Sequence, residues 1–592
     1  MGIMKKEKIK EFLIGLAIFA VICAGFYLYV FWEFDPIYGI NDDWTLYMVI
    51  SGSYLGYPEP HVNYMMYPLA CLLCGLYSIT SEIPWYGIML QGFVALCGFF
   101  LYFRIYYRLS KGIKRHIFSV LGLLVFLCSH IGIIIAIQYT QVGAICGATA
   151  IFLFLTADTK GKGCKEYLMA NIPTIIMATI SLNMRENTLY MCLPIAGMIL
   201  IAKWFVEDRK ITKEVIVRYS GLVFVLGVCL GGTIITHEIA YSSPEWKEYV
   251  RVNDIWTVGW DYYGFPKYEE IEEFLTENGM TQADYEVALA YQTFYRGEMK
   301  YSDYLTVITN AAKEKYDAQH TFQVKLNDAN EKIVNSLTRS SLRPLNLTVV
   351  LLFVTVIFLM FYTRNRMVLV PLLCYLFGRF FAWYFLLFAG RFPDRIAQGL
   401  FTMDLMVLLG FILYFGLGEK KGILKLKSVC ITGGLVLTAV FAVIIKDGTK
   451  MLNIMEEQGD IYQERWYGIK NYCQEHQENR YFLSGGSQTL FYFSDDIFET
   501  KTIGKPQNFY TNTNFDSPSP NFYDMIGAEY ESYLGDDMIE QDNHYWIYEK
   551  GCFSEEVDIV KFYKTEYDTF TYELVDTFDT GSTTFEVYYF DK

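Results

Sequence analysis

Long apolar runs recur along this chain of 592 residues and restrict it to folds that place many helices in a membrane. A run of about 20 apolar residues is long enough to span a bilayer as an α-helix. Lipid offers no partner to an unpaired backbone amide, so each run must satisfy its own hydrogen bonds. We therefore predict eleven transmembrane helices, at about 12–32, 85–107, 117–136, 142–157, 167–182, 188–205, 220–239, 345–362, 367–388, 397–417 and 428–446.

The distribution of basic residues predicts the orientation of these helices. Four lysines, at positions 5, 6, 8 and 10, precede the first run and place the N-terminus in the cytoplasm. The apolar stretch 64–80 is short, and counting it as a span would put the basic residues of 104–115 outside. We therefore expect an interfacial or re-entrant helix there. The later basic loops then fall inside, and the C-terminus falls outside a bacterial plasma membrane.

Charge separates the membrane part from a soluble C-terminal part. The net charge is −15, yet residues 447–592 carry 29 acidic and 10 basic residues, a net of −19. The rest of the chain is therefore slightly basic, and this split argues against a nucleic-acid partner. We expect an outer α/β domain over 447–592, with strands in RYFLSG and HYWIYE and a hairpin through Asp579. Its two cysteines, Cys473 and Cys552, could form one disulfide.

The remaining chain divides into three further parts. Residues 1–239 form an N-terminal transmembrane module whose first outer loop is 32–84. Residues 240–344 are expected to be an outer helical insertion, in which Thr281 and Asp284 match a capping box. Residues 345–446 supply the C-terminal spans.

The first outer loop carries the most unusual polar cluster, Asn41-Asp42-Asp43-Trp44. Two adjacent carboxylates near a membrane raise each other's pKa, which suits a general base. A solvated turn is the simpler interpretation. Against it stand the hydroxyl-, amide- and imidazole-bearing neighbours that would bind a sugar or acceptor: Tyr47, His61, Asn63 and Tyr64.

Arginines at unusual depth form the second candidate group. Arg379 lies within an apolar run, and Arg185, Arg391 and Arg395 lie at connections that we place outside. Such charges are expensive in lipid and tend to face a partner or a cavity. Pairing at helix ends would explain them, as for Arg185 with Glu186. Alternatively, their guanidinium groups would bind a phosphate. Glu186, together with Gln138 and Gln141 at another outer connection, is a further candidate for binding the sugar or the acceptor.

This layout resembles the GT-C-fold glycosyltransferases. The resemblance rests on a first span, an outer loop opening with the acidic pair Asp42-Asp43, an interfacial helix, many further spans and a C-terminal outer domain. It implies transfer of a sugar from a polyprenyl-phosphate donor to a cell-envelope glycan, lipid or protein, with Asp42 as the base. The segment Gly390-Arg-Phe-Pro-Asp-Arg395 is similar to the arginine-bearing loops that bind the donor phosphate. The lack of a GxGxxG or Walker motif agrees with a lipid-linked donor.

Two other classes of function remain open. A transporter or flippase of a lipid-linked or anionic glycan would also use charges inside a membrane, although such proteins often show internal repeats, which we do not find. A non-catalytic envelope protein would use mainly the acidic outer domain. No cofactor is certain, but Asp42 and Asp43 together with a phosphate could hold Mg²⁺ or Mn²⁺.

Overall fold

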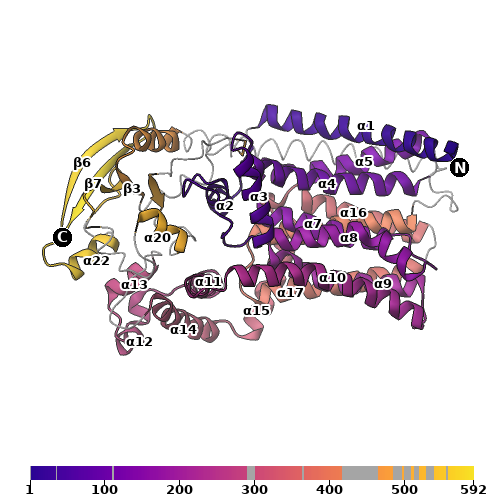
Figure 1. Ribbon diagram of the computed structural model, residues 1–592. Coiled ribbons are helices and arrows are strands. Elements are labelled where there is room, and N and C mark those ends of the chain that lie inside the picture. The colour runs from indigo at the N-terminus through magenta and orange to yellow at the C-terminus, as the bar shows by residue number, and fades with distance from the viewer. Residues whose placement is uncertain are drawn as a thin grey trace.

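A bundle of long helices makes up one part of the molecule, and short helices and a sheet gather at one end of it (Figure 1). The computed structural model describes residues 2–34, 36–109, 112–289, 300–362, 366–416, 464–483, 497–498, 508–511, 519–527, 539, 541–554 and 558–592. The long helices are α1 (Gly2–Glu33), α4 (Trp85–Arg108), α5 (Ile113–Ser129), α7 (Tyr139–Thr156), α8 (Cys164–Met184), α9 (Glu186–Glu207), α10 (Lys213–Ala240), α16 (Leu345–Tyr362), α17 (Leu369–Phe388) and α18 (Asp394–Phe411, continued by the π-helix η5, Ile412–Gly416).

The chain is a polytopic helical membrane protein. Within the described ranges, eight helices are long and apolar enough to cross a membrane, namely α1, α4, α7, α8, α9, α10, α17 and α18 with η5. Of the other expected spans, 345–362 contains a shorter apolar helix and 428–446 lies outside the described residues. The expected span 117–136 is interrupted because α5 ends at Ser129 and a short helix, α6 (Ile131–Ile135), follows.

The short apolar stretch after the first loop forms α3 (Tyr67–Ile79), which has 13 residues. At 1.5 Å per residue it is about 20 Å long, whereas the hydrocarbon layer is about 30 Å thick. It packs against α2 (Asn41–Ser51), α4, α8 and α10. Its length agrees with an interfacial or re-entrant helix, while its side of the membrane stays a prediction.

The segment between α10 and α16 is helical in its described residues. Thr281 and Asp284 form the predicted capping box: the Thr281 N–H donates to Asp284 Oδ2 (2.8 Å) and the Asp284 N–H donates to Thr281 Oγ1 (3.2 Å). The elements are α11 (Pro244–Thr257), the π-helix η1 (Val258–Tyr263), the 3-10 helix η2 (Tyr268–Glu270), α12 (Glu272–Glu277), α13 (Gln282–Leu289), α14 (Tyr301–Gln319), α15 (Phe322–Ser336) and η3 (Ser340–Leu342). The 3-10 helix η4 (Arg366–Val368) lies later, between α16 and α17.

A mixed five-stranded sheet confirms the predicted C-terminal α/β fold. Its order is β4-β3-β5-β7-β6; β3 runs parallel to β4 and β5, and β7 runs antiparallel to β5 and β6. The strands are β3 (Arg480–Leu483), β4 (Phe509–Thr511), β5 (His544–Glu549), β6 (Thr571–Asp579) and β7 (Thr584–Asp591), accompanied by a helix over 464–475, α20 (Pro520–Ile526) and α22 (Asp558–Glu566). The hairpin between β6 and β7 falls where the sequence predicts it.

The expected disulfide in this domain is wrong. Cys473 is buried within the helix over 464–475, whereas Cys552 is exposed in the turn after β5, and both thiols are free. The two cysteines therefore lie in different environments, and an apolar core holds Cys473 as a small hydrophobic residue.

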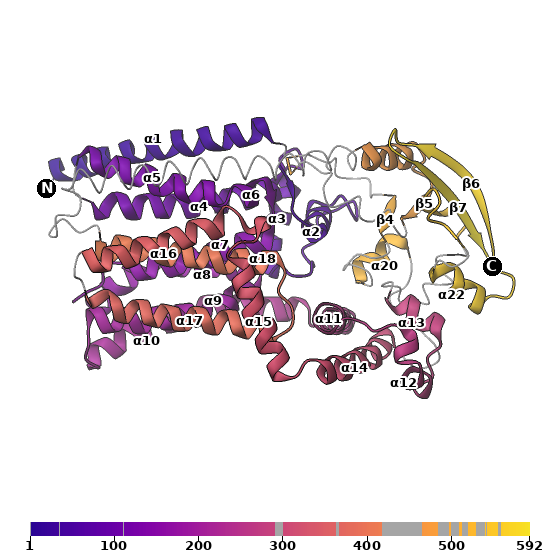
Figure 2. The same cartoon turned by 180° about the vertical axis from the view of Figure 1, so that it is seen from behind.

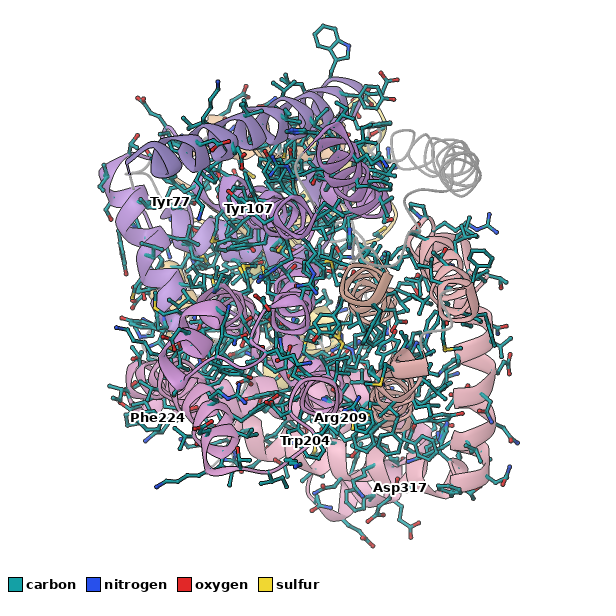
Figure 3. All side chains as sticks on the ribbon, turned by 90° about the vertical axis from the view of Figure 1, so that its right-hand side faces the viewer. Tyr77, Tyr107, Trp204, Arg209, Phe224 and Asp317 are labelled. Carbon is teal, nitrogen blue, oxygen red and sulfur yellow. The ribbon has the colours of Figure 1, made fainter. Side chains whose placement is uncertain are left out.

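The C-terminal domain packs directly onto the first loop. The Ile497 N–H donates to the Pro36 carbonyl (3.2 Å), and the rings of Trp44 and Trp466 meet edge to face at 5.8 Å. Both side views place the sheet and the inserted helices at the same end of the bundle (Figures 1 and 2). Figure 3 looks along the helices from the opposite end, where Arg209 follows α9. The first loop is thus enclosed between the bundle and the soluble parts.

Candidate active site

A two-residue ladder brings the acidic pair to the bundle. Strand β1 (Ile37–Tyr38) pairs in parallel with β2 (Ala136–Ile137), and the Gly39 N–H donates to the Ile137 carbonyl (2.8 Å). A Cβ on Gly39 would lie 2.8 Å from the Ala136 carbonyl oxygen, so glycine permits this close approach. Helix α2 begins directly after Gly39 and Ile40, and its first turn carries both aspartates.

Asp43 is fully buried where three helices begin. Its Oδ1 accepts hydrogen bonds from the Tyr86 hydroxyl of α4 (2.8 Å) and from the Tyr139 N–H of α7 (2.9 Å). Its Oδ2 has no hydrogen-bond partner. Burial raises the pKa of Asp43 well above its usual range, although the two hydrogen bonds and the charge of Arg395 oppose this. Asp43 therefore ties α2, α4 and α7 together.

Asp42 is only partly buried and lies beside a tyrosine and an arginine. Its Oδ2 accepts from the Tyr139 hydroxyl (3.4 Å), and the Arg185 guanidinium donates to the same hydroxyl and to Thr140 Oγ1 (3.2 Å). The guanidinium carbon lies 4.5 Å from the ring centre of Tyr64. Tyr139 thus connects the carboxylate of Asp42 with the cation of Arg185.

Tyr64 holds Arg185 from an unusual backbone conformation. Its φ of 71° is in the left-handed region, which bulky residues rarely adopt. Its ring lies nearly parallel to that of Tyr139, with centroids 6.4 Å apart. Residues held in such conformations cluster at functional sites, because surrounding contacts must outweigh the strain. The conformation places an aromatic face under the guanidinium, where a cation is favoured.

Arg391 and Arg395 complete a basic cluster, together with a carboxylate from the inserted segment. Arg391 pairs with Asp261 of η1, at 2.6 Å between Nη1 and Oδ2. Burial raises the pKa of Asp261, while the charges of Arg391, Arg395 and Arg185 lower it and that of Asp42 raises it. Three arginines and Asp42 are thus close enough to Asp261 to act on its charge.

The structure does not place Arg379 in this cluster. Its Nε donates to Asp404 Oδ2 (2.8 Å), and the Tyr375 hydroxyl donates to Oδ1 of the same aspartate. Arg379 lies nine residues before the end of α17, about 14 Å along the helix. A charge buried inside the bundle requires a partner, and Asp404 supplies it.

Tyr47 and His61, expected to bind a sugar or acceptor, lie in packed surroundings. Tyr47 is 3% exposed, between the rings of Tyr38 and Tyr77. His61 stacks on Trp246 with ring centroids 4.7 Å apart, and its Nδ1 lies 2.5 Å from Glu59 Oε1. These contacts join the first loop to α11.

The remaining candidates are close to the cluster or at its edge. Asn63 accepts from the Tyr64 N–H (2.9 Å), and its own Nδ2 is buried without a partner. Gln138 precedes α7 and its Nε2 is likewise without a partner, whereas Gln141 donates to Gln398. Glu186 follows Arg185 and accepts from the Tyr190 hydroxyl (3.4 Å).

Sequence reasoning missed Tyr86, Asp261 and Asp404. Tyr86 lies inside an apolar run, where an aromatic residue gives no separate signal. Asp261 is a lone carboxylate among aromatic residues in Trp-Asp-Tyr-Tyr, and Asp404 interrupts an apolar span just as Arg379 does. The last two are charges in apolar company, and that pattern could have identified them.

The cluster offers little to a resident metal ion. Across the described ranges, no group of three or more His, Cys, Asp or Glu side chains is arranged to hold one. Asp43 is buried against tyrosine donors and Asp261 faces an arginine, so these residues do not fit the octahedral oxygen shell of Mg²⁺.

Comparison with solved structures finds a similarity to the crystal structure of ArnT from Cupriavidus metallidurans in the apo state. It covers 99% of this chain and 98% of that chain, with a TM-score of 0.35 and 10% sequence identity. No protein-family profile and no curated protein matches the sequence. At this TM-score, residues of the two chains cannot be equated, so the site is interpreted from this chain's own contacts.

Proposed function

We propose that this protein is a membrane glycosyltransferase that moves a sugar from a polyprenyl-phosphate donor to a hydroxyl of a cell-envelope glycan, lipid or protein. The observation that carries this proposal is the convergence of a partly exposed carboxylate, Asp42, with Arg185, Arg391 and Arg395 at one end of the bundle. A base and an anion site side by side are the two requirements of this reaction.

Helix ends support an anion in this place. Helices α2, α4, α7, α9 and α18 all begin at this end of the bundle. The positive end of a helix dipole favours negative charge, and the first N–H of α7 already donates to the carboxyl of Asp43. A phosphate would therefore meet both guanidinium groups and backbone dipoles of the favourable sign.

An apolar groove beside Arg391 would accommodate the lipid part of such a donor. It has a volume of about 460 Å³ and is lined by Phe381, Tyr384, Phe385, Phe388 and Ala389 at the end of α17. Gly390 and Arg391 follow directly along the chain. An isoprenoid chain in this groove would deliver its phosphate to the arginine cluster.

The proposed reaction assigns distinct roles to the two aspartates. Asp42 takes the proton of the acceptor hydroxyl as that oxygen bonds to the sugar's anomeric carbon. The bond between this carbon and the phosphate oxygen breaks, and Arg185 and Arg391 stabilise the charge that develops on the leaving phosphate. Asp43 is a positioning residue, because it is buried and fixes the start of α7, from which Tyr139 reaches Asp42.

The test is in vitro transfer by the purified full-length protein with a polyprenyl-phosphate sugar and an envelope acceptor. Asp42→Asn keeps the shape and removes the base, so we expect transfer to fall by a factor on the order of 10²–10⁴. Asp317→Asn removes an exposed carboxylate on α14 that pairs with Lys313 and serves as the matched control. Near-normal turnover in Asp42→Asn would refute the role of this residue. Full transfer in Asp42→Asn/Asp43→Asn would show that neither aspartate is the base, whereas no transfer by the wild type from any polyprenyl-phosphate sugar would count against an enzymatic function and favour a transporter.

A further inference from the structure

Asp261 comes from the inserted segment and yet lies in the arginine cluster. Its carboxylate pairs with Arg391 in a contact where both side chains are about one-fifth to one-quarter exposed (21% and 24%). It sits in the π-helix η1, a rare conformation that is frequently found at functional sites. A phosphate that binds Arg391 would therefore compete with this carboxylate.

The backbone around Asp261 is fixed on both sides. Gly390 has a φ of +98°, and a Cβ there would lie 3.1 Å from the Tyr262 carbonyl oxygen and 2.9 Å from the Tyr316 hydroxyl. Trp256 and Phe265, which flank this segment along the chain, stack with ring centroids 5.1 Å apart. Close packing of this kind leaves side-chain rotation, not loop movement, as the way to separate Asp261 from Arg391.

The charge balance of the cluster depends on Asp261. Outside the buried Asp43, the three arginines face two carboxylates, Asp42 and Asp261. A donor with a sugar-phosphate diester carries one negative charge, whereas the polyprenyl monophosphate that leaves carries nearly two at neutral pH. A fixed carboxylate in the cluster therefore disfavours the product more than the donor.

We propose that Asp261 acts as an internal anion that holds Arg391 in the ligand-free protein, yields it to the donor phosphate, and weakens binding of the monophosphate product. This inference rests on the proposed polyprenyl-phosphate donor. It makes the inserted segment a part of the substrate site, with Asp261 as the residue that sets affinity for phosphate esters.

The experiment measures binding of a short-chain prenyl monophosphate to the full-length protein in nanodiscs at low ionic strength. Asp261→Asn removes the charge and keeps the shape, so we expect binding to tighten on the order of tenfold. Added salt should reduce this gain. The gain should vanish in Asp261→Asn/Arg391→Ala, because the guanidinium that would pass from Asp261 to the phosphate is then missing. Asp303→Asn, which removes the carboxylate of an exposed pair with Arg251 in the same segment, should bind like the wild type.

Two outcomes separate the failure of this inference from that of the proposed function. If the wild type binds the monophosphate through Arg391, but Asp261→Asn binds equally well or more weakly, Asp261 only braces Arg391 and the inference is wrong. If neither the wild type nor Asp261→Asn binds the probe and Arg391→Ala makes no difference, the lipid-phosphate donor itself is wrong.

Discussion

Replacing Arg185 with lysine should separate the geometry of this guanidinium from its charge. The guanidinium donates to two hydroxyls, of Tyr139 and Thr140, and lies over the ring of Tyr64. A lysine ammonium keeps the positive charge but cannot reach both hydroxyls and a phosphate in one plane. The substitution therefore removes at least one hydrogen bond of a charged donor, which contributes about 1.5–3 kcal/mol.

That loss corresponds to a fall of about 10- to 150-fold in kcat/KM for transfer from a polyprenyl-phosphate sugar. If Arg185 stabilises charge that appears only as the phosphate leaves, kcat should fall together with kcat/KM. Arg251→Lys, at an exposed ion pair of the inserted segment, is the matched control and should change neither constant. If kcat and kcat/KM of Arg185→Lys stay within about twofold of the wild type, far below the expected loss, charge alone suffices. That result would refute a requirement for the planar guanidinium.

Two further predictions concern stability. Arg379→Met leaves the buried Asp404 without its cation, so the free energy of unfolding should drop by about 3–5 kcal/mol, whereas Arg379→Met/Asp404→Leu should recover most of it. A lower midpoint of thermal unfolding in detergent would report this, and an unchanged midpoint with weaker donor binding would instead restore Arg379 to the phosphate site. The raised pKa of Asp43 means that its contribution to stability is complete below pH about 3.9 and is lost as the pH rises through the folded-state pKa. Asp43→Asn has no carboxyl to ionise, so its midpoint of thermal unfolding should rise relative to that of the wild type between pH 5 and pH 8. Parallel pH dependences of the two midpoints would contradict the raised pKa of Asp43.

The length and periodicity of the apolar runs were enough to predict the helices and strands that bury an apolar surface. The apolar runs predicted helices because a run of this length admits few other structures, and the aromatic-rich run HYWIYE, bounded by turn residues, predicted β5. The break of α5 at Ser129 could not be predicted in this way. Strand β2, which follows α6, pairs with residues that lie about one hundred positions earlier, and no local pattern encodes that partner.

The candidate site, too, could be predicted from the sequence only in part. The sequence singled out Asp42 and Arg185 because charges stand out beside apolar runs, and the structure places them around one tyrosine hydroxyl. Their proposed roles stay predictions. Arg379 was misplaced because the sequence does not state which charges pair: Asp404 lies 25 residues away on the next helix, at the same depth. Asp261 could not be assigned to the cluster from the sequence, because only tertiary packing determines the position of the segment that carries it.

The β1–β2 ladder also has a consequence for how the protein is made. Residues 36–43 leave the ribosome about one hundred residues before Ala136 and Ile137, and Arg391 follows some 250 residues later still. The two-residue ladder alone is too short to persist, so the acidic pair gains Tyr86 with α4, Tyr139 with α7 and the arginine cluster only as α18 takes its place. The proposed site is therefore absent while the first helices are being inserted, and it forms only at a late step of assembly.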